Sequence, residues 1–158
     1  MYILISISRQ CLELWRNDVC VNSYAVSTAL NGPGEEKNTG CTPRGDHLVR
    51  AKVGAGMPLN TVYIARRATG EVFSSALARQ YPDRDWILTR ILWLSGCEIG
   101  RNRLGSVDTM QRYIYIHGTP DTEPMGQPLS HGCIRMRNND ITQLFEQVDV
   151  GTRVIIEE

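Results

Sequence analysis

The chain has 158 residues, with 17 Lys and Arg against 17 Asp and Glu, so its formal net charge is zero. Apolar residues make up 42% and charged residues 22%, which is an ordinary balance for one globular domain and excludes a disordered chain. Without a basic excess, there is no electrostatic reason to expect a nucleic-acid partner. At this length we expect a single domain over residues 1–158. No stretch is apolar for long enough to span a bilayer, so we expect no membrane partner.

The N-terminal half contains short runs rich in β-branched and apolar residues, separated by polar or Gly- and Pro-rich turns. These runs predict strands over residues 2–8, 11–16, 19–26, 47–53 and 59–66. We interpret His47 as a surface or strand histidine, because no partner motif surrounds it. The neighbouring Arg66 and Arg67 are interpreted as a solvated basic pair at a strand edge.

The middle of the chain gives a weaker pattern. Residues 70–85 are expected to form a strand, a loop and a short helical turn. The apolar run 86–94 predicts a buried strand rather than a helix, because it is short and rich in β-branched and aromatic residues. The loop over 97–110 precedes a strand with candidate catalytic residues, and we expect Arg103, or Arg101, to lie at the rim of the site and meet substrate carboxylates.

The C-terminal third contains an alternating strand over residues 112–117, a proline-rich loop over 120–128 and one amphipathic helix. Asn138 and Asn139 are expected to cap this helix. Its apolar stripe at helical spacing consists of Ile141, Leu144, Phe145 and Val148, and a last strand covers 154–156. The expected fold is therefore mainly β: a sandwich or partly closed barrel of short mixed strands, with one clear α-helix near the C-terminus.

The stretch 130–135, Ser-His-Gly-Cys-Ile-Arg, carries the chemistry we expect of this chain. Cys133 follows a glycine, where a tight turn is easy, and a thiol becomes a nucleophile when a base takes its proton. His117 ends the strand before it and is better placed as that base than His131, because a residue two positions away in a sharp turn tends to point elsewhere. The backbone carbonyl of Gly118 would fix the tautomer of His117.

The remaining residues of the stretch have supporting roles in this hypothesis. The backbone N–H groups of His131, Gly132 and Cys133 would form an oxyanion hole for acyl transfer. Ser130 and Tyr115 are expected to line the substrate site. The alternative is a structural histidine near a buried free cysteine, which each residue alone would fit. No metal or cofactor is expected, because the histidines and cysteines lack the close paired spacing of metal ligands.

Three segments together resemble the signature of the YkuD-type L,D-transpeptidases: His-Gly-Thr at 117–119, Gly-Gln-Pro at 126–128 and Ser-His-Gly-Cys-Ile-Arg-Met at 130–136. The resemblance extends over most of the chain and is weakest over 51–83. It implies a bacterial cysteine enzyme that acts on peptidoglycan stem peptides, with the fold expected above. It also implies that Cys133 is the nucleophile and His117 the base, and that Arg135 contacts the carboxylate end of the substrate.

The resemblance further implies attack on the bond between meso-diaminopimelate and D-Ala in tetrapeptide stems, with release of D-Ala, and covalent inhibition by carbapenem β-lactams. Water as acceptor would make the chain an L,D-carboxypeptidase. A second stem or a free D-amino acid would make it a periplasmic L,D-transpeptidase. An alternative of another class is a non-catalytic muropeptide-binding module. The sequence starts with a short strand-like run rather than a signal peptide, and its five cysteines have no disulfide spacing. We therefore expect a cytoplasmic L,D-carboxypeptidase of muropeptide recycling.

Overall fold

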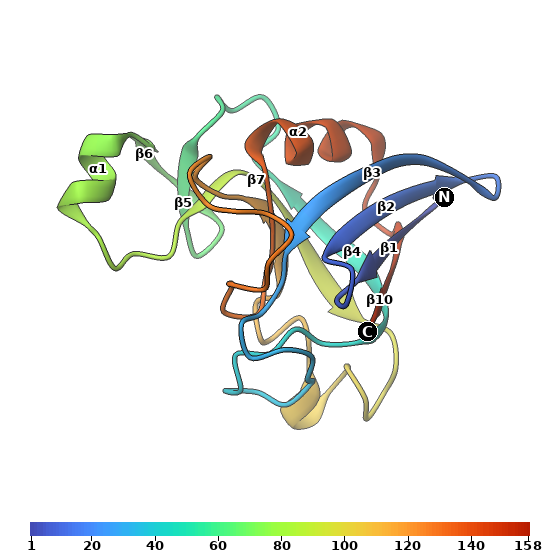
Figure 1. Ribbon diagram of the computed structural model, residues 1–158. Coiled ribbons are helices and arrows are strands. Elements are labelled where there is room, and N and C mark those ends of the chain that lie inside the picture. Colours follow the sequence, from blue (N-terminus) through green and yellow to red (C-terminus); the bar gives the residue numbers. More distant parts are fainter.

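Short strands are the main regular secondary structure of the chain, as the runs of β-branched residues predict (Figure 1). The structure is a computed structural model that describes residues 1–158. Its elements in chain order are β1 (Tyr2–Ser6), β2 (Cys11–Arg16), β3 (Val19–Ser27), β4 (Gly45–Val53), β5 (Thr61–Ile64), β6 (Arg67–Val72), α1 (Ser75–Gln80), β7 (Ile87–Gly96), the 3-10 turn η1 (Gly105–Val107), β8 (Tyr115–Gly118), β9 (Ile134–Met136), α2 (Asn138–Gln147) and β10 (Arg153–Glu157). The prediction of a mainly β fold with one clear helix near the C-terminus is confirmed.

Eight of the strands close into a barrel. Their order around the barrel is β4-β10-β1-β2-β3-β9-β8-β7, and the pairing of β7 with β4 closes it. Most pairs are antiparallel, but β1 with β10 and β8 with β9 are parallel. Closure leaves none of these strands with an unpaired edge, which holds each of them in place from both sides.

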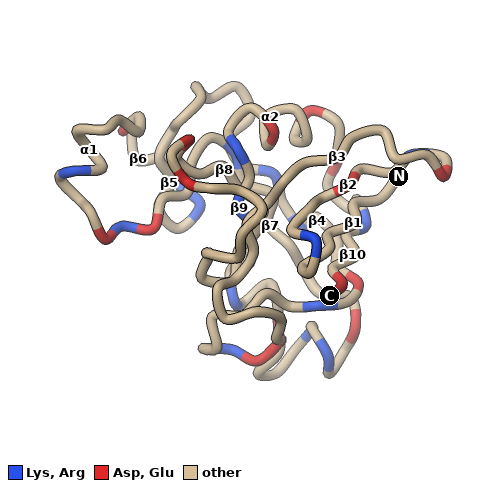
Figure 2. Tube along the Cα trace, viewed as in Figure 1, with Lys and Arg blue, Asp and Glu red and all other residues tan.

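The barrel interior is one hydrophobic core of 20 buried residues, to which nearly every barrel strand contributes. Helix α2 covers one end of it and inserts Ile141, Leu144 and Phe145 from the predicted apolar stripe (Figure 1). No helix is both long enough and apolar enough to cross a bilayer. Charges of both signs are spread over the surface, in keeping with the zero net charge (Figure 2).

Strands β5 and β6 and helix α1 form an extension beside the barrel, which we call the hairpin extension, residues 61–80 (Figure 1). It is joined to the barrel sheet through the pairing of β5 with β7. A separate small cluster of Val62, Trp86 and Leu88, with Phe73 and Leu77 against it, forms its core. The expected strand, loop and helical turn over 70–85 are therefore present, with the strand starting earlier than predicted.

Two local expectations were wrong. The predicted strand over 112–117 begins at Tyr115, because Tyr113 has a φ of 55° that breaks an extended run. The N-cap of α2 is Arg137, without a side-chain cap, and Asn138 is the first helical residue instead. The expectation that His47 is a surface or strand histidine is confirmed by its position in β4, where it is fully buried and hydrogen bonded to Thr109 Oγ1 (3.0 Å).

Candidate active site

The alternation of side chains along β8 and β9 sorts the predicted residues to one face. The register pairs Ile116 with Ile134 and His117 with Arg135. Ile116 and Ile134 point into the barrel core, so His117 and Arg135 point to the outer face of the same strands. Cys133 precedes Ile134 by one residue and shares that outer face. Two parallel strands thus place the predicted nucleophile and the predicted base on the same face.

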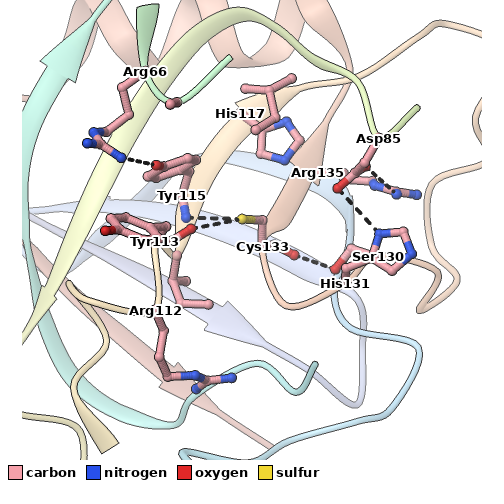
Figure 3. Close-up of a pocket in the computed structure, with 13 residues that line it drawn as sticks. Arg66, Asp85, Arg112, Tyr113, Tyr115, His117, Ser130, His131, Cys133 and Arg135 are labelled. Carbon is pink, nitrogen blue, oxygen red and sulfur yellow. Dashed lines mark hydrogen bonds and ion pairs between the residues drawn. The ribbon is translucent and has the colours of Figure 1, made fainter. Parts of the chain in front are cut away.

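This outer face is the floor of a cavity of about 420 Å³ (Figure 3). The lining contains every predicted side chain of the site except Arg103, and it also contains residues that the sequence analysis did not place there. The complete lining is Ala65, Arg66, Asp85, Ile87, Arg112, Tyr113, Ile114, Tyr115, His117, Ser130, His131, Cys133 and Arg135.

Cys133 is held as a neutral thiol. Its Sγ donates to the Tyr113 carbonyl (3.4 Å) and accepts from the Tyr115 N–H (3.4 Å). Desolvation by burial raises the pKa of Cys133 to about 12, although the Tyr115 N–H bond acts in the opposite direction. The preceding Gly132 has a φ of 130°, and a Cβ there would lie 3.3 Å from the Cys41 carbonyl oxygen. Glycine at this position therefore permits the turn that presents the thiol.

His117 is buried, and its hydrogen bond defines its tautomer. Its Nδ1 lies 2.6 Å from the Gly118 carbonyl oxygen, which can only accept, so Nδ1 carries the proton and Nε2 has the free lone pair. Burial lowers the pKa of His117, which keeps the imidazole neutral at pH 7. His117 and Cys133 face the same cavity as a neutral base and a neutral thiol (Figure 3).

The chain around Gly118 is in turn held by its neighbours. Asn138 donates from Nδ2 to the Thr119 carbonyl (2.9 Å), and its Oδ1 accepts from Thr89 Oγ1 (2.6 Å). A Cβ on Gly118 would lie 2.4 Å from Asn138 Oδ1 and 2.6 Å from the Leu88 carbonyl oxygen, so only glycine fits there. Asn138, expected to be a helix cap, instead ties the peptide after His117 to strand β7.

The predicted oxyanion donors are only partly free. Ser130 Oγ accepts from the Gly132 N–H (3.2 Å) and donates to the Cys133 carbonyl (2.6 Å), which fixes the turn. The Gly132 N–H is therefore engaged, contrary to the expectation that it would be an oxyanion donor. The N–H groups of His131 and Cys133 donate to no acceptor within the protein and remain the candidates for this role.

One wall of the cavity carries paired charges. Asp85 accepts from Arg135 Nη2 (3.0 Å) and contacts His131 Nδ1 (3.3 Å), and Glu123 lies 3.9 Å from Arg135 Nη1. Arg135 thus lines the cavity as expected, but its charge is already balanced by two carboxylates.

The opposite wall was missed by sequence reasoning. Arg66 donates to the hydroxyl of Tyr115 (2.8 Å), and Arg112 beneath it donates to the carbonyls of Gly34, Glu35 and Cys41. Burial lowers the pKa of Arg112. The only sequence signal for Arg66 was its position at a predicted strand end, and nothing distinguished it from its neighbour Arg67.

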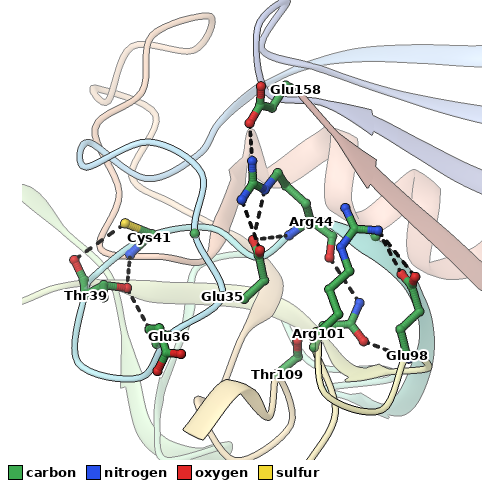
Figure 4. A network of polar contacts seen from close by, with 12 residues as sticks. Glu35, Glu36, Thr39, Cys41, Arg44, Glu98, Arg101, Thr109 and Glu158 are labelled. Carbon is green, nitrogen blue, oxygen red and sulfur yellow. Dashed lines mark hydrogen bonds and ion pairs between the residues drawn. The ribbon is translucent and has the colours of Figure 1, made fainter.

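The expectation that Arg103 lies at the rim of the site was wrong. Arg103 lines a different cavity with Arg50 and Cys97. Its loop is folded back, because Asn102 Nδ2 donates to the carbonyls of Arg44 (3.1 Å) and Asp46 (3.0 Å). The neighbouring Arg101 pairs with Glu98 in the polar network around Arg44 (Figure 4).

Comparison with known proteins identifies the family of the chain. The family model of the L,D-transpeptidase catalytic domain, YkuD, matches residues 1–156. A probable L,D-transpeptidase of Escherichia coli, YbiS, is 56% identical over 43 residues, which are 27% of this chain and 14% of that protein.

Solved structures show the same fold at low sequence identity. L,D-transpeptidase 3 from Mycobacterium tuberculosis superposes with a TM-score of 0.60 and 18% identity, over 99% of this chain and 60% of that one. L,D-transpeptidase LdtMt1 in complex with imipenem gives a TM-score of 0.59 and 19% identity, over 99% and 58%. The chain therefore spans 58–60% of the length of these two relatives. It belongs to the YkuD family of L,D-transpeptidase catalytic domains.

Proposed function

We propose that this chain catalyses acyl transfer from peptidoglycan stem peptides through a thioester on Cys133. The observation that carries the proposal is that Cys133 and His117 line the same cavity, and that the Nδ1–H of the neutral imidazole is held by the Gly118 carbonyl, leaving Nε2 as the base. Membership of the L,D-transpeptidase family supports the substrate class, a tetrapeptide stem whose bond between meso-diaminopimelate and D-Ala is cleaved.

In the first step, the sulfur of Cys133 attacks the carbonyl carbon of diaminopimelate while His117 Nε2 takes the thiol proton. Because burial disfavours both the thiolate and the imidazolium, this proton moves as the carbon–sulfur bond forms rather than before it. The carbon–nitrogen bond then breaks, His117 returns the proton to the departing amine of D-Ala, and an acyl thioester remains. The free N–H groups of His131 and Cys133 are the donors proposed to stabilise the oxyanion.

We propose water as the acceptor, which makes the activity that of an L,D-carboxypeptidase. His117 takes a proton from the water molecule as the water oxygen attacks the thioester carbon. The carbon–sulfur bond then breaks, and His117 returns the proton to the sulfur of Cys133. Water needs no binding subsite, and the volume of about 420 Å³ is in the range for one small ligand. All five cysteines are free, as in proteins of reducing compartments, which supports a cytoplasmic role in muropeptide recycling.

The second candidate is an amine acceptor, that is, transpeptidation. A recess of about 210 Å³ adjoins the cavity, and the two share Asp85, His131 and Arg135. Three carboxylates, Asp83, Asp85 and Glu123, line this recess against two arginines, Arg84 and Arg135, and this excess of negative charge suits the ammonium group of a second stem or of a free D-amino acid.

Mass spectrometry of a disaccharide-tetrapeptide incubated with the protein, with and without D-methionine, distinguishes these candidates, with Cys133→Ala as control. Loss of D-Ala that D-methionine does not alter is the expected result. Exchange of D-Ala for D-methionine, or a dimer, would establish transpeptidation instead. An unchanged substrate in every tube would contradict enzymatic activity and favour a muropeptide-binding module. Fractionation of the native host tests the cytoplasmic location, which recovery with the periplasmic fraction would overturn.

A further inference from the structure

The turn between β5 and β6 is built from residues that do not suit it. Ile64 pairs with Arg67, so the loop consists of Ala65 and Arg66 alone, with φ values of 47° and 66°. Two-residue hairpin loops with both φ values positive are the type that favours Asn-Gly, since other side chains resist this conformation. Backbone strain of this kind persists where surrounding contacts hold it, and it often accompanies function. The turn therefore gives no reason for an arginine at position 66, and the reason must lie in its side chain.

Aromatic side chains hold the guanidinium of Arg66 at the cavity wall. Its central carbon lies 4.4 Å from the ring centroid of Trp93 and 5.0 Å from that of Tyr113. Its Nη1 donates to the hydroxyl of Tyr115 (2.8 Å), as Figure 3 shows. This hydrogen bond uses one of five N–H donors, so a planar, oriented group with spare donors faces the cavity.

Arg66 also differs from the other cations of the cavity in its charge balance. Arg135 is paired with Asp85 and Glu123, and Arg112 is engaged by three backbone carbonyls. No carboxylate lies within 4 Å of Arg66. The Arg66 guanidinium lies across the cavity from the wall that carries Asp85 and Arg135, with Cys133 between the two walls (Figure 3).

We propose that Arg66 binds a carboxylate of the stem peptide and thereby sets substrate specificity, a role that the family resemblance implied for Arg135. The inference rests on the proposed function, because it takes the stem peptide as substrate. Two carboxylates flank the scissile bond: the terminal carboxylate of D-Ala and the side-chain carboxylate of diaminopimelate. Either one offers two oxygens to the planar guanidinium, and the geometry is that of a charge-assisted, two-point contact.

The test compares three substrates: the tetrapeptide, its terminal carboxamide and its side-chain carboxamide at diaminopimelate. The variant is Arg66→Gly, which suits the positive φ of the turn and so preserves the fold, and Arg66→Lys retains the charge without the planar group. Arg67→Ala is the matched control, because it removes an exposed arginine with the same charge from the next position. Thermal unfolding of each variant checks that the fold is retained.

For wild type, we expect amidation of one carboxylate to lower kcat/KM roughly 10- to 100-fold, the range for a hydrogen bond to a charged group. Arg66→Gly should lower kcat/KM on the tetrapeptide by a similar factor, mainly through KM, and should no longer distinguish that carboxamide from the acid. Arg66→Lys should recover part of the loss, and Arg67→Ala should stay within about twofold of wild type.

The sensitive carboxamide identifies which carboxylate Arg66 binds. If Arg66→Gly keeps the wild-type preference for acids over both carboxamides, the inference is overturned while the proposed function stands. If wild type releases D-Ala from none of the three substrates, the proposed function fails and the inference fails with it.

Discussion

The two walls of the cavity belong to regions of different construction. His117 and Cys133 are on or beside β8 and β9, which have a paired strand on each side and share a core of 20 buried residues. Arg66 is at the tip of the hairpin extension, which is joined to the barrel sheet through the pairing of β5 with β7 and packs on a cluster of only three buried residues. The proposed catalytic groups are thus placed in the barrel, and the proposed specificity group is placed where sequence can change at little cost to the fold.

The largest effect should come from the base in the barrel. His117→Gln removes the lone pair that accepts the thiol proton, and we expect D-Ala release to fall roughly 100- to 10,000-fold. Steady-state kinetics with the tetrapeptide measures this loss, and the circular dichroism of the variant should match wild type. A decrease of less than tenfold would show that another group takes the proton.

Core substitutions test the difference in construction directly. Ile5→Ala in the barrel core should lower the free energy of unfolding by about 2–5 kcal/mol, because a fully buried side chain leaves a cavity. Phe73→Ala in the hairpin extension should lower it by about 1–2 kcal/mol, because that ring is only partly buried against Trp86. Urea unfolding measures both. Equal losses would mean that the extension is as much a part of the cooperative core as the barrel is.

The barrel should also be acid-sensitive through His47. Burial lowers the pKa of His47 from 6.5 to about 4, so below pH 6.5 the unfolded chain binds a proton that the folded chain does not. The free energy of unfolding should therefore fall as the pH drops from about 6.5 to about 4, by up to about 3 kcal/mol, and His117 adds to it in the same direction. In His47→Gln this fall should be smaller. Parallel pH profiles for the two proteins would contradict the assignment.

The smallest effect is expected outside both walls. Arg103→Ala should leave KM and kcat for the tetrapeptide within about twofold of wild type, because its loop is folded toward Arg44 and Asp46 and away from Cys133. Kinetics on the same substrate as for the Arg66 variants gives the comparison. A loss of substrate affinity would place this loop at the site after all.

The sequence was informative where a residue acts through its local pattern. Alternation placed His117 at the end of a strand, and the Gly132–Cys133 pair marked a tight turn, so the catalytic hypothesis needed little long-range information. The walls of the site depend on contacts between residues that are far apart in the sequence. Asp85 and Arg135 are separated by 50 residues, and Arg66 and Tyr115 by 49, so no short pattern could place them together.

Some errors have a physical reason in single residues. Asparagine is a residue type that favours helix N-caps, but Asn138 makes a tertiary hydrogen bond to Thr119 and accepts one from Thr89, and these outweigh that local preference. Tyr113 interrupts an alternating run because its carbonyl is turned onto the sulfur of Cys133. The closure of the barrel by β4 and β7 likewise rests on a pairing that periodicity cannot indicate.

The central claim, that Cys133 forms an acyl thioester, is tested most directly by the intact mass of the protein after exposure to excess imipenem. We predict that wild type gains the mass of one imipenem, that the adduct maps to Cys133, and that Cys133→Ala gains nothing although Cys20 and Cys97 remain exposed. An unmodified wild-type protein, or equal labelling of Cys133→Ala, would contradict the account.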